Sequence, residues 1–311
     1  MRASTVKEYA RSLGASAVGI APAGPVEKRQ QYLDWLARGY AGEMTYLKRY
    51  RNERLNPEEL FPGARSIIVV GLNYYPAANR QRQSDVQHRV ALYARGEDYH
   101  RVLRRMLKRL RTRLHREHPD LRGRICVDTA PFMDKYWAGM AGIGWQGKHT
   151  NLVSREFGSW LVIGSLVING EMDCHDRPHL DRCGNCRRCL EACPTRAFPE
   201  PYQLDATRCI SYWTIESKQD KIPADIAAGM DNEVFGCDRC ISVCPFNRFS
   251  KPERTQALKR TCQSELIESG EVLRLTEEQF DLEFAGSAIR RAGLRGIKRN
   301  IDAIRHKIPP G

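Results

Sequence analysis

The sequence contains no apolar run long enough to cross a membrane. Its most apolar stretch, Trp160–Ile168, has nine residues, less than half of the ~20 residues that a transmembrane helix needs. The first residues, MRASTVKEYARSLG, interleave charged and apolar side chains and lack the apolar core of a secretory signal peptide. We therefore expect a cytoplasmic protein with no membrane partner.

Cysteine is scarce over most of the chain and concentrated in one segment. Of the 11 cysteines, only Cys126, Cys174 and Cys262 lie outside the 62 residues from Cys183 to Cys244. In a reducing cytosol such a density favours metal ligation over disulfide formation. The cysteine-rich segment is therefore expected to be a metal-binding module.

Acidic residues are outnumbered, with 37 Asp+Glu against 50 Lys+Arg and a net charge of +13. Such a surplus attracts polyanions, nucleic acid first among them. Arg101–Arg116 contains eight basic residues and no acid. This segment could be a helix face that is simply solvated or one that binds phosphate, and the sequence favours neither. Ile289–Lys307 has seven basic residues against one acid. There we favour phosphate contact, because Gly293 and Gly296 let the main chain approach closely.

The first 170 residues carry alternating strand and helix patterns. Continuous apolar runs bounded by glycine or proline predict buried strands, and apolar residues at helical spacing predict helices with one buried stripe. The predicted strands are Ser16–Ile20, Ser66–Tyr74, Arg124–Asp128 and Ser159–Ile168, and the predicted helices are Val6–Leu13, Lys28–Arg38, Tyr99–His118 and Asp134–Ala141. We predict a mixed α/β (α+β) fold in three parts: an α/β domain over 1–172, a cysteine-rich domain over 173–252 and a basic helical tail over 253–311.

The cysteine spacing is that of the bacterial ferredoxin run for [4Fe–4S] clusters. One half reads Cys183-x2-Cys186-x2-Cys189-x3-Cys193-Pro194, and the other reads Cys237-x2-Cys240-x3-Cys244-Pro245 with Cys209 supplying the missing member. In such runs the cysteine before the proline ligates the other cluster. We therefore assign one cluster to Cys183, Cys186, Cys189 and Cys244, and the second to Cys193, Cys209, Cys237 and Cys240. Two zinc sites are the alternative, but zinc sites rarely combine three ligands at two-residue gaps with a Cys-Pro at both ends.

Iron–sulfur clusters move single electrons but do not by themselves break bonds in an organic substrate. The run Gly142-x-Gly144-x-x-Gly147 matches a dinucleotide fingerprint, yet it follows a predicted helix instead of a strand. It also fails as a P-loop, because His149 stands where Ser or Thr must follow Lys148. The glycines predict a close backbone approach or a positive φ. The chain is therefore either an electron carrier or an enzyme with another cofactor.

Asp128 ends a predicted strand, at a place where the chain leaves the sheet and where ligands commonly bind. Burial there would raise its pKa and make it a proton donor. From position alone, a role in capping the next turn is the stronger interpretation.

Three segments together resemble the epoxyqueuosine reductase family: RGEDYH (Arg95–His100), VDTAPFMDKYWAGMAGIGWQGKHTNL (Val127–Leu152) and TRCISYWTIE (Thr207–Glu216). The resemblance implies an oxidoreductase that removes the epoxide oxygen of epoxyqueuosine at the wobble position of tRNA. It implies that cobalamin, cycling between cob(II)alamin and cob(I)alamin, binds the α/β domain. The two [4Fe–4S] clusters of a ferredoxin-like domain would reduce it with electrons from an external low-potential donor.

The resemblance also assigns roles to single residues. It implies that Asp128 is the acid that protonates the departing oxygen. This interpretation replaces the role in capping the next turn that position alone favours. The residues that match family positions near the corrinoid are Arg54, Asp128, Lys148, His149, Asn151, Ser211 and Asp238. The candidate tRNA contacts are Lys218, Arg290, Arg291, Lys298 and Arg299. The alternatives are a corrinoid iron–sulfur reductase of a small molecule, similar to reductive dehalogenases, and a ferredoxin-type electron carrier without catalytic activity.

Overall fold

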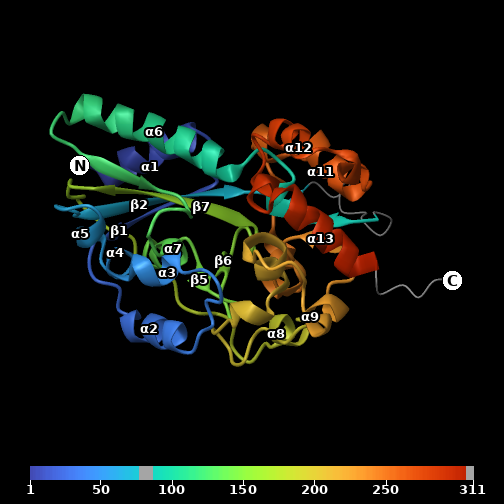
Figure 1. Cartoon of the computed structure of the whole chain (residues 1–311). Helices are drawn as coiled ribbons and strands as arrows, with labels where there is room; N and C mark the ends of the chain where they lie inside the picture. Colours follow the sequence, from blue (N-terminus) through green and yellow to red (C-terminus); the bar gives the residue numbers. More distant parts are fainter. Residues whose placement is uncertain (77–86, 306–311) are drawn as a thin grey trace.

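A four-stranded antiparallel sheet forms the centre of the N-terminal part of the protein (Figure 1). The computed structural model describes residues 1–76 and 87–305. In sheet order the strands are β1 (Ala17–Pro22), β2 (Ser66–Asn73), β7 (Leu161–Ile168) and β4 (Gly123–Cys126). All eight residues of β2 are buried. Both faces of the sheet are therefore covered, which explains why the sequence of this strand is continuously apolar.

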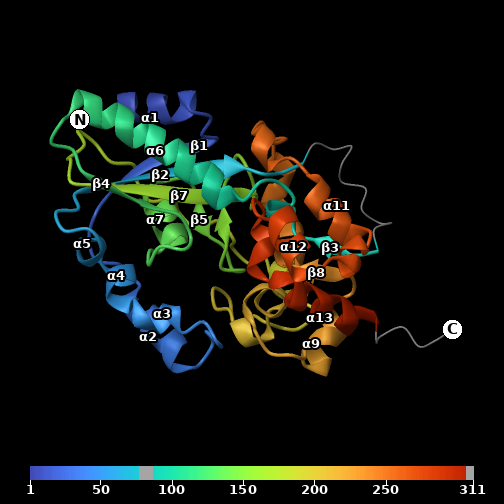
Figure 2. The same ribbon diagram turned by 45° about the horizontal axis from the view of Figure 1, so that its top comes forward.

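Helices α1 (Ala3–Ser12) and α6 (Tyr99–Glu117) cover one face of the sheet, as Figures 1 and 2 show. Asp98 caps α6, because its carboxylate accepts a hydrogen bond from the amide of His100. The apolar stripe that includes Leu103 and Leu107 packs on the sheet, while the basic side chains face away from it. The predicted amphipathic helix is thus confirmed.

The opposite face is covered by α7 (Asp134–Met140) and by short helices that precede β2. These are α2 (Arg29–Ala37), α3 (Tyr46–Arg49), α4 (Arg51–Leu55) and α5 (Pro57–Leu60). A hairpin of β5 (Trp145–Gln146) and β6 (Leu152–Val153) follows α7. A Cβ on Gly144 would lie 2.1 Å from the carbonyl oxygen of Val153, and Gly142 has a φ of 71°. The glycines therefore serve tight backbone packing and a positive φ, as predicted.

The cysteine-rich segment consists of short elements. They are α8 (Arg188–Glu191), the 3-10 turn Ala206–Arg208, the π-helical turn Tyr212–Glu216, α9 (Ala224–Gly229), β8 (Glu233–Phe235), α10 (Arg239–Ser242) and the 3-10 turn Pro245–Phe249. β8 pairs in parallel with β3 (Arg89–Val90), which precedes the 3-10 turn Leu92–Ala94. The segment is thereby fastened to the N-terminal part.

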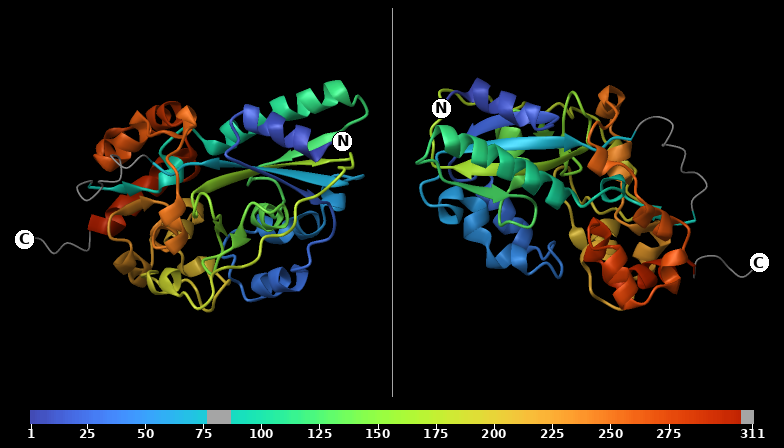
Figure 3. Two further views of the ribbon diagram at one scale, coloured as in Figure 1. Left: turned by 180° about the vertical axis from the view of Figure 1, so that it is seen from behind. Right: turned by 90° about the horizontal axis from the view of Figure 1, so that it is seen from above.

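The C-terminal helices gather at one end of the sheet, away from the N-terminus, in every view of Figures 1 to 3. They are α11 (Cys262–Glu268), α12 (Glu277–Glu283) and α13 (Gly293–Arg305). The 3-10 turn Gln256–Leu258 precedes α11, and the 3-10 turns Glu271–Arg274 and Ala288–Arg291 join the three helices. Ile297 and Ile301 of α13 share one apolar core with Trp213 and Phe235 of the cysteine-rich segment. The tail is therefore packed into the fold, and the predicted boundaries at 172 and 252 stay predictions.

The mixed α/β class is confirmed, and each predicted strand and helix is present within a few residues of its predicted bounds. The strands of the main sheet are all antiparallel. The sequence interpretation of Asp128 relied on the rule that ligands bind at the carboxyl ends of parallel strands. Because this sheet is antiparallel, that rule does not apply to Asp128. Among the described residues, no helix is long and apolar enough to cross a membrane.

Candidate active site

Asp128 lies two residues beyond the end of β4, in a tight turn at the edge of the sheet. Its φ of 46° is in the left-handed region, and across it the Thr129 amide donates to the Val127 carbonyl. The chain therefore reverses direction at this residue, a conformation that costs energy for a side chain other than glycine. The turn leaves 65% of the Asp128 side chain exposed. It holds a carboxylate outside the sheet, available to a ligand.

His100 joins Asp128 to a second carboxylate. Its Nε2 lies 3.1 Å from Asp128 Oδ2, and its Nδ1 lies 2.6 Å from Asp98 Oδ1. Asp98 is the residue that caps α6, so the start of this helix fixes the orientation of the imidazole. The ring of Tyr99 stacks on the His100 ring with 4.0 Å between centroids. The first turn of α6 thus supplies the partners of Asp128.

The charges of this cluster set its pKa values. The protein atoms that displace water from one side of the Asp128 carboxylate would raise its pKa, but the hydrogen bond and the charge of His100, with a hydrogen bond from Tyr99 and the charge of Lys135, lower it below its usual value. Burial would lower the pKa of His100, but the hydrogen bonds and charges of Asp128 and Asp98 raise it to about 9. The prediction of a raised Asp128 pKa is therefore wrong for this state of the protein. Near neutral pH, the proton of the pair is on His100.

Lys135, in the first turn of α7, connects Asp128 with the cysteine-rich segment. Its Nζ donates to Asn151 Oδ1 at 2.6 Å. Burial lowers its pKa, while the charge of Asp128 and the thiolates of Cys240 and Cys209 oppose that shift. These groups therefore lie within electrostatic reach of one ammonium. Lys135 is the link between the acid and the second cysteine group.

Two buried polar atoms beside this cluster have no hydrogen-bond partner among the described residues. They are Nε of Arg54 and Oδ1 of Asp134. Burial and then the charge of Asp128 raise the pKa of Asp134 to about 7. A buried polar atom without a partner is costly unless a ligand satisfies it. An unpaired donor and an unpaired acceptor suit a cofactor with amide side chains, such as a corrinoid, because an amide both donates and accepts.

The eight cysteines of the segment divide into two groups in space. After burial, the thiolates of Cys183, Cys186 and Cys244 are the causes that raise the pKa of Cys189 to about 11. In the same way, Cys237, Cys209 and Cys193 raise the pKa of Cys240. The cysteines that influence one another's pKa in these two cases are the same two sets of four that the spacing predicts, and the assignment of ligands to clusters stays a prediction. Four thiols per set is the donor set of a [4Fe–4S] cluster.

The cysteine groups are not arranged as sites for a single ion. Among the described residues, no three Cys, His, Asp or Glu side chains form a group that could hold one metal ion. In a cubane each thiolate binds a different iron, so the ligands surround the cluster and need not meet at one point. The donor set fits two such clusters, and the positive charge of iron would offset the effect of burial on the thiols.

The predicted cofactor residues occupy three kinds of position. Arg54 and Asn151 lie at the Asp128 cluster. Lys148 points to the first cysteine loop, where Nζ donates to the carbonyls of Gly184 and Cys186. His149 is buried, with its Nε2 3.3 Å from Ser159 Oγ, and burial, together with the charge of Lys135, lowers its pKa to about 4.

Ser211 and Asp238 lie at the second cysteine group. Ser211 hydrogen-bonds the Cys209 thiol through both its amide and its side chain. Asp238 accepts a hydrogen bond from the Leu92 amide at 2.7 Å, and burial raises its pKa to about 6. Both residues are therefore placed to shape the surroundings of a cluster.

The predicted tRNA contacts differ in how free their side chains are. The exposed Arg291 pairs with Glu216 at 2.7 Å and is close enough to Asp128 for that charge to raise its pKa. Lys218 Nζ donates to the Arg291 carbonyl at 3.2 Å. These two residues therefore lie beside the acid.

The side chains of the other three basic residues are less available to contact tRNA. Arg290 pairs with Asp281 at 3.0 Å, and Lys298 donates to the Leu275 carbonyl at 3.3 Å. Arg299 is turned inward, with its guanidinium bound to the carbonyls of Trp213, Ser217 and Gln219 and to Asn300. The prediction that Arg299 contacts phosphate is corrected, because its donors are already used to hold the loop that carries Lys218. Lys307, in the basic run, lies outside the described residues.

Sequence reasoning missed His100, Tyr99, Lys135 and Tyr46 as members of the site. Tyr46 stands over Arg54, with 5.9 Å between the guanidinium carbon and the ring centroid. Burial, followed by the charge of Glu216, raises its pKa to about 12. His100, Tyr99 and Lys135 all lie inside the segments that carried the family resemblance. That was the available signal, but spacing alone does not show which side chains in a segment meet.

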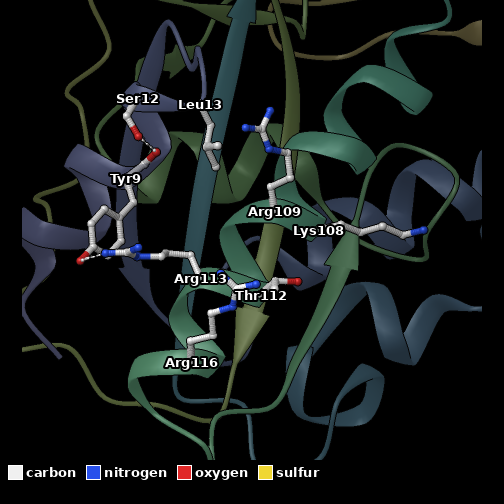
Figure 4. Close-up of a pocket in the computed structure, with 8 residues that line it drawn as sticks. All are labelled: Tyr9, Ser12, Leu13, Lys108, Arg109, Thr112, Arg113 and Arg116. Carbon is white, nitrogen blue, oxygen red and sulfur yellow. Dashed lines mark hydrogen bonds between the residues drawn. The ribbon is translucent and has the colours of Figure 1, made fainter.

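A second basic region lies away from this site, between α1 and α6 (Figure 4). A pocket of about 630 Å³ there is lined by Tyr9, Ser12, Leu13, Lys108, Arg109, Thr112, Arg113 and Arg116. Arg113 pairs with Glu117 and donates to the Tyr9 hydroxyl, whereas Lys108, Arg109 and Arg116 have no ion pair within the described residues. The pocket holds neither cysteine nor a carboxylate, so it lacks the groups needed for redox or acid catalysis.

Comparison with known proteins decides the family. The chain is 42% identical over 291 residues to an epoxyqueuosine reductase of Synechocystis, with 92% of this chain and 99% of the relative covered. The chain belongs to the epoxyqueuosine reductase family. A relative in this family from Leadbetterella byssophila is 40% identical, with 95% of this chain and 96% of the relative covered. The predicted resemblance is thereby confirmed.

Two family models match the parts of the site. The model described as "Epoxyqueuosine reductase QueG, DUF1730" matches residues 54–129, which begin at Arg54 and end just after Asp128. The model described as "4Fe-4S double cluster binding domain" matches residues 182–247, which include all eight cysteines. The match therefore supports iron–sulfur clusters over the zinc alternative.

A solved structure of an epoxyqueuosine reductase with an epoxyqueuosine-modified tRNA stem loop superposes on the chain with a TM-score of 0.85. The two sequences are 28% identical, and the match covers 97% of this chain and 80% of the other. The fold of an epoxyqueuosine reductase therefore extends over nearly the whole of this chain. Members of the family are oxidoreductases, and the expectation of an enzyme is confirmed.

Proposed function

We propose that this protein reduces epoxyqueuosine to queuosine at the wobble position of tRNA, with cobalamin and two [4Fe–4S] clusters as cofactors. The observation that carries the proposal is the position of Lys135, which lies within electrostatic reach of Asp128 on one side and of Cys209 and Cys240 on the other. An acid and a redox module thereby share one site. Conversion of the epoxide to an alkene and water requires two electrons and two protons, which is the combination that this site provides.

The cofactors would be held by the residues described above. Cys183, Cys186, Cys189 and Cys244 would ligate one cluster, and Cys193, Cys209, Cys237 and Cys240 the other. Arg54, Asn151 and Asp134 would contact cobalamin in the part of the chain before residue 173. When bound, the clusters supply single electrons and cobalamin supplies a cobalt centre that passes two of them to the epoxide.

The polar side chains would handle the protons and the position of the substrate. Asp128 would protonate the oxygen as its bond to carbon breaks, with a proton that His100 passes to the carboxylate as the reaction proceeds. Asp98 holds the imidazole so that Nε2 faces Asp128. The Lys135 ammonium lies close enough to attract the negative charge that develops on the departing oxygen.

The substrate is proposed to reach Asp128 past Lys218 and Arg291. Both are basic, and Arg291 lies next to the acid. Arg290 and Lys298 would lie farther along the same RNA. Because tRNA is the substrate, we place the protein in the cytoplasm, where an external low-potential protein donates the electrons.

The test is anaerobic purification with cobalamin supplied, followed by metal analysis and an assay on an anticodon stem-loop that carries epoxyqueuosine. We expect about eight irons per chain, four for each cluster, bound corrinoid, and a product that is lighter by the mass of one oxygen atom. A stem-loop that already carries queuosine is the control and should not change mass. Eight irons without corrinoid or turnover would instead indicate an electron carrier. Zinc in place of iron would overturn the proposal.

A further inference from the structure

We propose that the surface over the first cysteine group is the docking site for an acidic protein that delivers electrons one at a time. This surface, the docking face, consists of Leu180, Arg182, Arg187, Arg188, Arg248 and Phe249. The inference rests on the proposed function, because it takes Cys183, Cys186, Cys189 and Cys244 as cluster ligands.

A hollow in the docking face reaches one of these cysteines. It lies between α8 and the turn after α10, has a volume of about 690 Å³ and is lined by Cys244 together with Arg188 and Arg248. α8 lies at the edge of the molecule, on the side away from α1 and α6 (Figures 1 and 3). A partner seated here would therefore approach the first cysteine group without covering the Asp128 site.

The arginines of the docking face are not paired with carboxylates. Arg182, Arg187, Arg188 and Arg248 are all exposed, and none has an ion pair or a side-chain hydrogen bond within the described part of the chain. The Arg248 guanidinium lies over the ring of Phe249, 4.6 Å from its centroid, a contact that leaves its charge unneutralised. By contrast, Arg290, Arg291 and Arg295 of the C-terminal region each pair with a carboxylate.

Few acidic groups offset these arginines. Asp181 accepts a hydrogen bond from the Tyr202 hydroxyl, and Glu191 is the carboxylate that lines the hollow. A cluster of unpaired arginines attracts an acidic partner and raises its rate of association.

The docking face also has two exposed apolar side chains. Leu180 is 75% exposed and Phe249 is 45% exposed. Their segments meet at Trp145, whose ring lies 4.9 Å from that of His179 and 4.7 Å from that of Phe246. Trp145 Nε1 also donates to Cys183 Sγ at 3.4 Å. Exposed apolar side chains on the same face as unpaired arginines suit a small, short-lived interface of the kind that redox partners form.

The order of the two cysteine groups supports entry at this face. Lys135, beside Asp128, is influenced by Cys240 and Cys209 of the second group. Cys244 of the first group lines the surface hollow instead. The exposed Gly184 and Asn185 lie between the first two cysteines of that group. Electrons would therefore enter at the first group, pass to the second and leave toward the active site.

The number of electrons that one epoxide needs fixes how many times a one-electron donor must bind. A donor with a flavin hydroquinone anion gives one electron to the first cluster and becomes a neutral semiquinone, with no proton transferred. Two such encounters supply the two electrons that convert one epoxide to an alkene. The two protons reach the oxygen through Asp128 and water.

An acidic flavodoxin is the probe for this surface. Binding of oxidised flavodoxin to the holoenzyme is measured by isothermal titration calorimetry, and reduction of the clusters by flavodoxin hydroquinone is followed by stopped-flow absorbance without tRNA. For the wild-type protein we expect both the affinity and the rate to fall about tenfold or more between about 20 mM and about 200 mM salt. Dithionite is the control reductant, because it needs no protein interface.

Charge reversal locates the interface. In the Arg188→Glu/Arg248→Glu double variant, we expect the Kd for flavodoxin to rise at least about tenfold and reduction by flavodoxin to slow by a similar factor. Reduction by dithionite and the iron content should not change. The matched control is Lys108→Glu, which reverses an exposed and unpaired charge on α6 and should change the Kd less than about twofold. If the double variant loses iron, Arg187→Glu replaces it.

Three results would overturn the proposal. The first is wild-type binding that does not weaken with salt, and the second is a double variant that binds flavodoxin like the wild type. The third is competition between an anticodon stem-loop and flavodoxin for the face, which would make it an RNA surface. Failure of the docking proposal leaves dithionite-driven epoxide reduction intact, whereas failure of the proposed function abolishes that activity and leaves flavodoxin binding measurable.

Discussion

The imidazole of His100 lies 3.1 Å from the carboxylate of Asp128 and shares one proton with it. Two residues from distant points of the chain thus form the acid of the proposed site. Asp128 by itself holds no proton to donate near neutral pH, and His100 lowers its pKa further. His100, with a pKa raised to about 9, stores the proton that Asp128 would deliver. This arrangement leads to the first two predictions.

Replacing Asp128 with Asn should abolish epoxide reduction, with a loss of at least about 100-fold in kcat, because general acid catalysis contributes that much or more. The iron and corrinoid content should stay the same, since Asn is nearly isosteric with Asp. Turnover is measured by mass spectrometry of the stem-loop. Asp120→Asn, at another exposed position, should have no effect. A variant with normal turnover would show that the proton comes from another group.

Replacing His100 with Gln should change the pH dependence of the reaction. In the wild-type protein, kcat should decline as the pH rises through about 9, where His100 loses its proton. In His100→Gln, the decline should begin at least about one pH unit lower, because the proton must then be held by the carboxyl group itself. The measurement is kcat between pH 6 and pH 10 with dithionite as donor. Parallel profiles for the two proteins would contradict the proton-storage role.

The same pair should affect stability with a defined sign. His100 has a pKa raised to about 9, so its contribution is complete below its unfolded value of about 6.5 and is lost as the pH rises through 9. Asp128 has a lowered pKa, so its contribution is present above about 4 and is lost as the pH falls. Between these limits, wild type should exceed His100→Gln by about 1–2 kcal/mol in free energy of unfolding, a value reduced by solvent screening of the exposed Asp128. Denaturant titrations at pH 6 and pH 9.5 measure the difference, which should shrink at the higher pH.

Arg299 should matter for stability more than for RNA contact. Its guanidinium binds three backbone carbonyls and Asn300, so Arg299→Ala should lower the free energy of unfolding by about 1–3 kcal/mol. Arg290→Ala, which removes an exposed ion pair, should cost less than about 1 kcal/mol. Urea titrations of the two variants test the contrast. Equal losses would mean that the inward position of Arg299 is not important to the fold.

Lys218 and Arg291 should contribute to RNA affinity through charge. In Lys218→Ala/Arg291→Ala, the slope of log K against log salt for an anticodon stem-loop should become less negative by about 1.4, about 0.7 for each single-stranded phosphate contact. Lys108→Ala, an exposed position on α6 away from the C-terminal helices, is the control. Filter binding at several salt concentrations gives the slopes. An unchanged slope would place the RNA elsewhere on the surface.

The cysteine assignment predicts different outcomes for two single changes. Cys244→Ala should remove a ligand of the first cluster and lower the iron content toward about four per chain. Cys174→Ala should leave iron unchanged, because Cys174 is exposed and belongs to neither group. Iron analysis with electron paramagnetic resonance of the reduced proteins distinguishes the two. Equal iron in both variants would refute the assignment.

The sequence by itself determined the secondary structure, and its cysteine spacing predicts the two ligand groups. The ligand groups follow from short, local spacing, and the strands and helices follow from hydrophobic periodicity, since both depend only on neighbours along the chain. The family resemblance also depended on contiguous residues, such as those around Asp128. Even the close backbone packing at Gly144 could be predicted, because only glycine allows such an approach.

Only the tertiary structure decided which charges meet. His100 and Asp128 are 28 residues apart in sequence, and Arg299 reaches the Ser217 carbonyl from 82 residues away. No local pattern encodes such contacts, because they arise when the start of α6 meets the turn after β4 and when α13 packs on the loop after Trp213. The pKa of Asp128 was mispredicted for the same reason. The sequence suggested a buried carboxyl group, whereas 65% of the Asp128 side chain is exposed, and the partner that lowers its pKa is supplied by another element of the fold.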